Sequence, residues 1–406
     1  MIGIDASWGN GGGLVLRGAL TLSVLTGRAV RLTRIRARRT SPGLKLQHLR
    51  IVESLARLCN AFVDGAAIGS QTLVFEPRHA IGRGPLGDAG REAGKDLVLD
   101  IDTPGSLTLL LQTLLLPLSF SGQVSRLRLI GVTHAPRSPA YENLAWSWLP
   151  QLERAGYRAE LSLQAAGFAP KGGGIVHATI HPAAAIAPLD LAQRGALLRI
   201  TGRSLVACLD RSVAERQRLH VMARLHGLDV PVSIDCGAIP AAVPGAFIVL
   251  QAEFEHSQQS FFALGELGKP PEAVAAEVSD ALMSCLEGGG AVDSHLASQL
   301  LLPLSFADGD SELSVSRISE HMLVTAELID RFFSDAVVIN GRLGEPGGLI
   351  VHGRGVPQVL TQASIPESVE SVNSLPKNLP WSVGPAQARA RGGHPGSIVL
   401  SSLGAR

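Results

Sequence analysis

The chain has 406 residues, of which 46% are hydrophobic, 17% are charged and only 4% are aromatic. This length and composition favour two or more domains, or one domain with an insertion, around a packed interior of Leu, Ala, Val and Gly. The net charge of +1 excludes a basic field over the whole surface, so any polyanion must bind a local patch.

The cysteines and the apolar runs give no sign of export or of a membrane. Cys59, Cys208, Cys236 and Cys285 are scattered without CxxC spacing, which argues against a zinc site and a disulfide framework. The N-terminus has no basic region followed by an apolar core. The longest apolar run, residues 107–120, contains Thr, Gln, Pro and Ser and is too short to span a bilayer. We therefore expect a soluble, cytoplasmic protein without a membrane partner.

A glycine-rich turn near the N-terminus is the first feature that suggests a ligand. A short apolar strand at 2–4 is followed by four glycines within residues 9–13, and then by a helix-like run with Arg17 one turn in. Such a turn before a helix presents unpaired backbone N–H groups to an anion. The spacing matches neither GxxxxGK[ST] nor GxGxxG, so the turn could also be a tight turn without a ligand.

The next strand pattern ends in a basic cluster of Arg34, Arg36, Arg38 and Arg39. Alternation along a strand predicts that Arg36 and Arg38 share one side of the strand end. Arginine forks beside a glycine turn favour a phosphate ligand. The alternative is a solvated basic loop.

An internal repeat indicates one α/β unit that is used several times. The segment LLLPLSF at 114–120 recurs at 300–306, and each copy precedes an alternating strand pattern, at 125–129 and 311–315. Weaker copies of the same helix–strand layout lie at 19–32 and 149–163, where chance similarity is a credible alternative.

The remaining periodicity fills in the same α/β pattern. We expect helices at 49–61, 213–226 and 270–286, and strands at 73–75, 97–101, 175–180, 197–200 and 247–253. Residues 78–95 read as a loop, residues 167–174 as a second glycine turn, and Ser106 as the N-cap of the helix that follows it.

The predicted fold class is α/β, in α+β layers, with repeated units forming a large domain and a smaller α/β domain inserted in it. We assign residues 1–184 and 269–350 to the large domain and residues 185–268 to the inserted domain. The helix at 270–286 is expected to return to the main body. Residues 361–406, rich in Pro, Ser, Gly and Arg without periodicity, are expected to be disordered.

Few polar residues stand in patterns that suggest chemistry. Gln112 and Gln299 each interrupt an apolar helix at a similar register of the repeat, so they could direct amides to a shared cleft or be satisfied core groups. His321 lies between a strand pattern and an amphipathic run, in a context that suits either a catalytic or a structural histidine. We find no trustworthy Ser-His-Asp order, HExxH or paired-carboxylate motif.

Seven motifs in a fixed order resemble the RNA 3'-terminal phosphate cyclase family over nearly all of residues 1–350. They are ID-x-S-x-G-x-GGG-x-x-L-R at 4–17, IRA-x-R-x-x-PGL-x-x-QHL at 35–49, IGSQTLVFEP at 68–77, PGSLTLLLQTLLLPL at 104–118, GFAPKGGG at 167–174, HLASQLLLPL at 295–304 and EHMLVTAELIDRFF at 320–333. The expected insertion at about 185–268 also lies where that family carries one.

The resemblance implies an ATP-dependent ligase that converts an RNA 3'-phosphate into a 2',3'-cyclic phosphate through an adenylyl-histidine intermediate. It places His321 at the position of the nucleophile and Arg17, Arg36 and Arg39 near the phosphates. The implied nucleotide pocket is lined by Gln47, Gln112, His295, Leu296, Ala297, Ser298 and Gln299. A divalent metal, Mg or Mn, and an RNA with a 3'-phosphate end are the implied cofactor and partner, and no DNA partner is expected.

The sequence departs from the family pattern at positions that concern the metal. Asn10 stands where the family carries a metal-binding Glu, Ser298 stands where it carries an Asp, and Leu14 replaces a usual Gln. The loss of two acids is expected to weaken metal binding or to shift it onto substrate oxygens and water.

Two alternatives stay open at this stage. One is an RNA-binding or assembly protein that keeps the fold without turnover. The other is an enzyme of the enolpyruvyl transferase type, which resembles this fold more distantly and would bind phosphoenolpyruvate rather than ATP. The sequence distinguishes neither ATP from GTP nor one oligomeric state from another.

Overall fold

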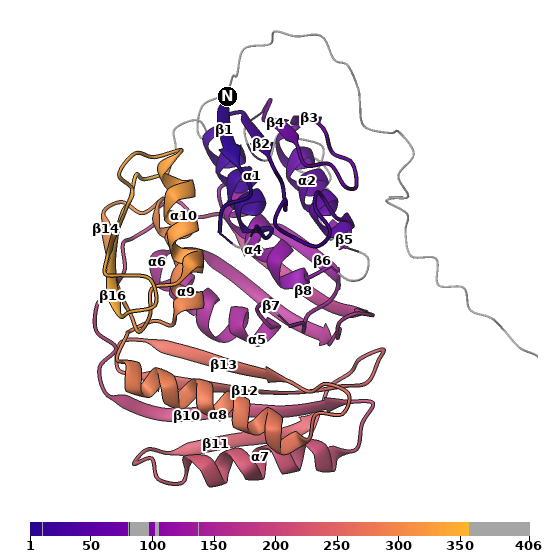
Figure 1. Ribbon diagram of the computed structural model, residues 1–406, viewed down its shortest axis with the longest axis vertical. Coiled ribbons are helices and arrows are strands. Elements are labelled where there is room, and N and C mark those ends of the chain that lie inside the picture. The colour runs from indigo at the N-terminus through magenta and orange to yellow at the C-terminus, as the bar shows by residue number, and fades with distance from the viewer. Residues whose placement is uncertain (10, 80, 82–96, 102–104, 137, 357–406) are drawn as a thin grey trace, which may run out of the picture. The chain divides into compact units, whose positions relative to one another are not determined.

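Figure 1 shows the protein in a computed structural model, which describes residues 1–9, 11–79, 81, 97–101, 105–136 and 138–356. Three predictions fall wholly or mostly outside these residues: the metal position Asn10, the loop at 78–95 and the disordered tail at 361–406. All described residues belong to one unit, Met1–Ser368. Among them, no helix combines the length and the apolar character that crossing a membrane requires.

Three four-stranded sheets within the described residues share one strand order. The first sheet runs β1 (Ile2–Asp5), β2 (Val30–Thr33), β4 (Leu73–Glu76) and β3 (Phe62–Asp64). The second runs β5 (Leu97–Asp100), β6 (Ser125–Gly131), β8 (Gly174–His181) and β7 (Arg158–Ala165). The third runs β9 (Asp190–Leu191), β14 (Asp310–Val315), β16 (Gly347–His352) and β15 (Val337–Asn340). In each sheet the first two strands pair in parallel and the others pair antiparallel.

The helices connect these strands in one order as well. The first unit uses α1 (Leu14–Thr26) and α2 (Leu46–Cys59), and the third uses α9 (Ser294–Leu304) and α10 (Glu320–Asp330). The second uses α4 (Leu107–Ser119) and then the continuous run of α5 (Tyr141–Asn143), the π-helix η1 (Leu144–Trp148) and α6 (Leu149–Ala155). Each unit therefore runs strand, helix, strand, helix, strand, strand, which confirms the predicted α/β class and its repeated unit.

The two copies of LLLPLSF lie at equivalent places, at the ends of α4 and α9. Both helices are apolar on most sides because their surroundings are hydrophobic on most sides. They share one large hydrophobic cluster with α1 and α10. The repeat in the sequence thus marks the buried helices of the second and third units.

A fourth sheet interrupts the third unit between β9 and α9. It runs β11 (Val232–Ala238), β10 (Leu197–Ala207), β12 (Gly245–Phe254) and β13 (Gln258–Leu264). As Figure 1 shows, α7 (Arg211–Leu225) and α8 (Pro271–Gly288) lie side by side along it. The strand predicted at 197–200 is much longer in the structure, because the pattern was broken by Gly202, where a Cβ would come within 2.6 Å of the Val249 carbonyl oxygen.

This sheet and its helices have their own hydrophobic cluster. α8 contributes Val274, Val278 and Leu282 to that cluster, so the expectation that the helix at 270–286 returns to the main body was wrong. The division into a large domain and an inserted domain at 185–268 stays a prediction. The packing of α8 supports a C-terminal boundary of the insertion after this helix.

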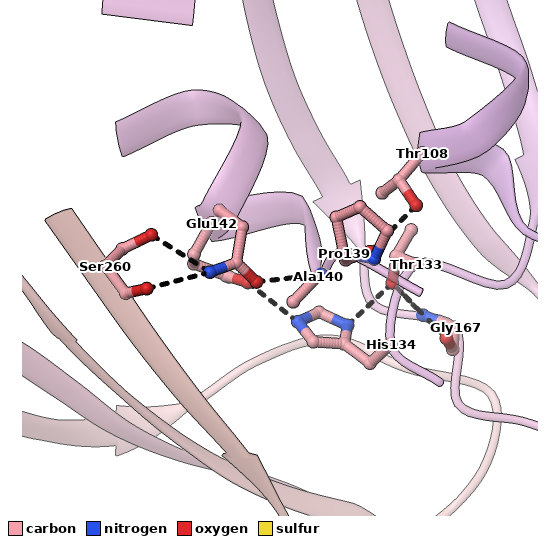
Figure 2. A network of polar contacts seen from close by, with 9 residues as sticks. Thr108, Thr133, His134, Pro139, Ala140, Glu142, Gly167 and Ser260 are labelled. Atoms are coloured by element: carbon pink, nitrogen blue, oxygen red, sulfur yellow. Dashed lines mark hydrogen bonds and ion pairs between the residues drawn. The ribbon is translucent and has the colours of Figure 1, made fainter. Parts of the chain in front are cut away.

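A buried polar network connects the second unit to the fourth sheet (Figure 2). His134 is fully buried, and its Nε2 lies 2.9 Å from Oε2 of Glu142 while its Nδ1 lies 2.7 Å from Oγ1 of Thr133. The imidazole stacks with Phe168 and lies 4.3 Å, centroid to centroid, from the ring of Phe247 on β12. Asn143 donates a hydrogen bond of 2.9 Å to Oγ of Ser260 on β13. Because these buried groups are paired, they hold the two parts together without the cost of an unsatisfied polar atom.

Candidate active site

The N-terminus of α1 has no side-chain cap at its N-cap residue. Gly13 occupies the N-cap position and offers no side chain, and the first turn contains no acidic residue. The N–H groups of that turn therefore lack the side-chain acceptor that most helices provide. Together with the positive end of the helix dipole, they form a site that favours an anion.

Two side chains converge on the space above Gly13. A Cβ at this position would lie 2.7 Å from Nη1 of Arg17 and 3.0 Å from Nε2 of His48, so these two side chains approach Gly13 more closely than any other residue would allow. Arg17 is half-buried, and desolvation lowers the pKa of its guanidinium to about 10, which keeps it charged at neutral pH. We call the space bordered by Gly13, Arg17 and His48 the Gly13 cradle.

His48 contributes a neutral N–H donor to this cradle. Its side chain is 2% exposed, and its Nδ1 accepts the backbone N–H of Lys45 at 3.0 Å. Burial is the main cause that lowers the pKa of His48 to about 3, and the charges of Arg17, Arg36 and Lys45 lower it further. The single proton of the ring must then sit on Nε2, the nitrogen that faces Gly13.

The basic loop after β2 differs from its predicted geometry. β2 ends at Thr33, and both Arg34 and Arg36 have positive φ, near 54° and 53°. The backbone there is a turn, so the prediction that Arg36 and Arg38 share one side of a strand end was wrong. Nη1 of Arg36 donates to the carbonyls of Ser41 and Gly43, at 2.8 and 3.1 Å.

This loop is tied to the glycine turn through Arg38. Nη1 of Arg38 donates to the carbonyl oxygen of Gly9 at 3.2 Å. A Cβ at Gly11 would lie 3.2 Å from the Cβ of Arg38. Burial is the first cause that lowers the pKa of Arg36, followed by the charge of Arg39. The loop therefore places several guanidinium groups beside the turn, as a phosphate site requires.

The N-terminal end of α10 forms the opposite side of the site. A Cβ at Gly9 would lie 2.8 Å from Cγ2 of Val324, and a Cβ at Gly18 would lie 2.6 Å from Cδ2 of Leu328. These two glycines let α10 lie directly along the glycine turn and α1. Ser319 caps α10 by accepting the N–H of Met322 at 3.3 Å, so the helix begins immediately before His321.

His321 is half-buried at this start of α10. Desolvation is the largest cause that lowers its pKa, and the neighbouring His295, Arg17 and Arg39 lower it further, while Glu320 acts in the opposite direction. The rings of His321 and His295 are 6.5 Å apart, centroid to centroid. The imidazole is therefore neutral near pH 7, and a neutral imidazole nitrogen is a competent nucleophile.

At the start of α9, only some of the five predicted pocket residues present polar side chains. His295 is exposed and Ser298 and Gln299 are half-buried, but Leu296 and Ala297 belong to the hydrophobic cluster. The carbonyl of Gln299 accepts the indole N–H of Trp148 at 3.4 Å. Which of these five residues contact a nucleotide stays a prediction.

Gln112 and Gln47 complete the predicted pocket residues. Nε2 of Gln112 is buried, and no hydrogen-bond partner for it is found among the residues that the structure describes. Gln47 is half-buried on the first turn of α2, next to His48. Because an unpaired buried amide is costly, Gln112 suits a role in which a ligand supplies its acceptor.

The described residues contain no cage for a metal ion. No group of three or more His, Cys, Asp or Glu side chains among them has a suitable arrangement. The carboxylate of Glu320 does approach the glycine turn, since its Cδ lies 3.5 Å from the position of a Cβ at Gly9. One carboxylate fits the coordination of a Mg²⁺-like cation only where phosphate oxygens and water supply most ligands.

His48 is the residue that sequence reasoning undervalued. Sequence reasoning assigned it no role beyond its place in the motif at 35–49, whereas the structure gives it a buried, neutral ring. Its position three residues after Lys45, at the start of a helix, was the available signal, because a side chain there can bond back to the N-cap backbone.

Comparisons with known proteins bear on this site. A profile of the RNA 3'-terminal phosphate cyclase family matches residues 8–339. The RNA 3'-terminal phosphate cyclase of Methylococcus capsulatus is 40% identical over 360 residues, which cover 87% of this chain and 97% of that protein. The proteins of that name from Pseudomonas fluorescens and Thermococcus gammatolerans are 42% and 38% identical, over 79% and 85% of this chain and 90% and 96% of theirs.

A solved structure also shows a distant likeness. The enolpyruvyl transferase NikO from Streptomyces tendae matches 86% of this chain and 48% of its own, with 13% sequence identity and a TM-score of 0.34. A likeness at this level carries no argument about function. The comparisons therefore do not favour the enolpyruvyl transferase alternative, nor do they favour a binding protein without activity.

Proposed function

Because the chain belongs to the RNA 3'-terminal phosphate cyclase family, we propose that it converts an RNA 3'-terminal phosphate into a 2',3'-cyclic phosphate with consumption of ATP. This is the activity of an ATP-dependent ligase. The observation that carries the proposal is the neutral imidazole of His321 beside a cationic site whose Gly13 cradle suits phosphate.

In the first step, a ring nitrogen of His321 attacks the α-phosphorus of ATP. The bond from that phosphorus to the α,β-bridging oxygen breaks, and pyrophosphate leaves. In this proposal Arg17, the Nε2–H of His48 and the first N–H groups of α1 donate to phosphate oxygens, which stabilises the charge that develops in transfer; the proximity of the two side chains to the uncapped start of α1 supports this role. A divalent cation would add charge neutralisation on the phosphates.

In the later steps, His321 passes AMP to an oxygen of the RNA 3'-phosphate. The vicinal 2'-hydroxyl then attacks the activated 3'-phosphorus, loses its proton and releases AMP. Arg36 and Arg39 are the further phosphate-binding residues of the proposal, and Gln47, Gln112 and residues 295–299 line the nucleotide. We also expect the protein to work in the cytoplasm, where RNA ends and ATP are available.

Incubation with α-labelled ATP and Mg²⁺ or Mn²⁺ tests this proposal. Wild-type protein is expected to retain label on denaturing gels, and His321→Ala is expected to retain none, because the attacking nitrogen is gone. An RNA with a labelled 3'-phosphate should become resistant to phosphatase only with wild-type protein. Absence of label on wild type under all metals, with RNA binding intact, would instead support a non-catalytic protein.

A further inference from the structure

We infer that Glu320 is the protein's ligand for the divalent cation that accompanies the nucleotide triphosphate. The inference rests on the proposed function, because the cation would be held jointly with phosphate oxygens. The carboxylate of Glu320 comes from α10, on the opposite side of the site from α1. In the sequence it is far from the glycine turn.

The first argument is the position of Glu320. It is the first residue of α10, and its Cγ and Cδ lie 3.6 and 3.5 Å from the position of a Cβ at Gly9. It directly precedes His321 in the first turn of the helix. The carboxylate therefore lies where the glycine turn meets the residue that attacks the α-phosphate.

The second argument is the availability of this carboxylate. No hydrogen bond or ion pair to Glu320 is found among the described residues, although guanidinium groups surround the turn. Asp5, the acidic residue that ends β1, is already engaged, since it accepts the N–H of Ser7 and pairs with Arg34 at 3.0 Å. Glu320 is thus an exposed acid at the site whose oxygens remain open to a cation.

The third argument is the chemistry of the cation. Mg²⁺ keeps several waters and is commonly bound by one or two carboxylates together with substrate phosphates. The described part of the chain offers no cluster of three acidic, His or Cys ligands, so a cation here needs the phosphates. A single carboxylate from α10 would complete such a shared site.

The competing role for Glu320 is helix stabilisation. A negative charge in the first turn of α10 interacts favourably with the helix dipole, by roughly 0.3–1 kcal/mol. This role predicts a small loss of stability on neutralisation and no effect on metal binding. The two roles are therefore separated by a direct measurement of bound metal.

The test is Mn²⁺ titration of the full-length protein with α,β-methylene ATP, which cannot transfer AMP, with free Mn²⁺ counted by electron paramagnetic resonance. In Glu320→Gln the apparent Kd for Mn²⁺ should rise at least about tenfold, as much as the loss of an outer-shell partner costs in other sites. Glu320→Asp, which keeps the charge on a shorter side chain, should recover part of the affinity. The matched control is Glu327→Gln, on the same helix, whose carboxylate pairs with Arg331 at 2.9 Å.

The outcomes separate this inference from the proposed function. Wild-type affinity for Mn²⁺ in Glu320→Gln, with the nucleotide analogue still bound, would overturn the role of Glu320 and leave the cyclase proposal standing. An equal loss in Glu327→Gln would overturn it too, because the effect would then be general to the charge of α10. If the wild-type protein fails to bind the analogue with or without Mn²⁺, both proposals fall. Thermal unfolding of each variant without ligand excludes loss of the fold as the cause.

Discussion

The first helices of the three repeated units have the same place in the fold but begin differently. α4 is capped by Ser106, whose Oγ accepts the N–H of Leu109, and α9 is capped by Asp293, whose Oδ1 accepts the N–H groups of His295 and Leu296. α1 begins at Gly13 and has no side-chain cap. Two copies of the unit thus satisfy N–H groups of the helix N-terminus with a side chain, and one copy has no such cap, as the proposed phosphate site requires.

The difference teaches that a single N-cap residue can decide whether a repeated unit serves stability or binding. The topology is the same in all three units, and so is the apolar character of the helices. What distinguishes α1 is the missing side chain at Gly13 and the two N–H donors, from Arg17 and His48, that border the resulting space.

The largest effect is expected when the N-cap glycine of α1 is replaced by aspartate, the N-cap residue of α9. In Gly13→Asp the carboxylate would accept the N–H groups of the first turn, attract Arg17 and fill the Gly13 cradle. Since two charge-assisted hydrogen bonds of about 1.5–3 kcal/mol are at stake, labelling with α-labelled ATP should fall by at least about 100-fold. Gly13 has φ near −83°, so the backbone allows an L-residue there, but its Cβ would displace Nη1 of Arg17 and crowd Nε2 of His48, so the fold of the variant has to be measured.

Thermal unfolding of Gly13→Asp provides the control for that experiment. A midpoint equal to or above that of the wild type, together with lost labelling, would show that α1 gives up stability for binding. Undiminished labelling would contradict the assignment of the Gly13 cradle to phosphate.

A subtler change removes one donor and leaves the rest of the site in place. In His48→Asn the side-chain oxygen can still accept the N–H of Lys45, as Nδ1 does now, but the donor that faces Gly13 is lost. Loss of one such hydrogen bond, about 1–1.5 kcal/mol, should weaken binding of α,β-methylene ATP by about tenfold in isothermal titration calorimetry. His48→Gln, whose amide nitrogen can reach the place of Nε2, should bind more tightly than His48→Asn.

The same histidine predicts a pH dependence of stability. Its pKa is about 3 in the folded protein and 6.5 in an ordinary environment, so the unfolded chain binds more protons than the folded chain between these values. The free energy of unfolding should therefore decrease as pH falls below 6.5, by about 1.4 kcal/mol per pH unit from this group at full effect. Urea unfolding at pH 7.5 and at pH 5 should show a smaller decrease in the free energy of unfolding for His48→Asn than for the wild type. An equal decrease in both proteins would contradict a contribution of His48 to the pH dependence.

The smallest expected effect concerns the capped helices. Removal of the cap of α9 in Asp293→Ala should lower the free energy of unfolding by about 1 kcal/mol, because two N–H groups lose their acceptor. Urea unfolding measures this loss. If the cap serves folding alone, the affinity for α,β-methylene ATP should stay unchanged, and a marked loss of affinity would show that this helix start also serves the ligand.

The sequence predicted those parts of the fold that depend on periodicity. The duplicated LLLPLSF indicated two equivalent helices, and Ser106 was correctly identified as an N-cap because its side chain and position suffice for the inference. The extent of β10 was missed because Gly202 breaks the β pattern at the place where the sheet needs close backbone approach. The packing of α8 was missed because amphipathicity does not say which sheet a helix covers.

The site was less predictable than the fold. The resemblance supplied His321 and the arginines as expectations, but the arrangement depends on backbone features that periodicity does not encode. Positive φ at Arg34 and Arg36 turns the basic segment away from strand geometry. The neutral state of His48 depends on burial and on a bond to Lys45, and the approach of Glu320 depends on how α10 packs against Gly9.

The insertion between β9 and α9 has a consequence for the order of folding. The backbone N–H of Leu189 donates to Oγ of Ser311, 122 residues later in the chain, so β9 must wait for β14 before it can pair. Closing a flexible loop of that length is slow and carries an entropic cost. An insertion that collapses early around its own apolar cluster would bring the two ends closer and shorten the effective loop. Because His321, the proposed nucleophile, follows β14, a nascent chain would contain Gly13, Arg17 and His48 long before the residue proposed to attack ATP is in place.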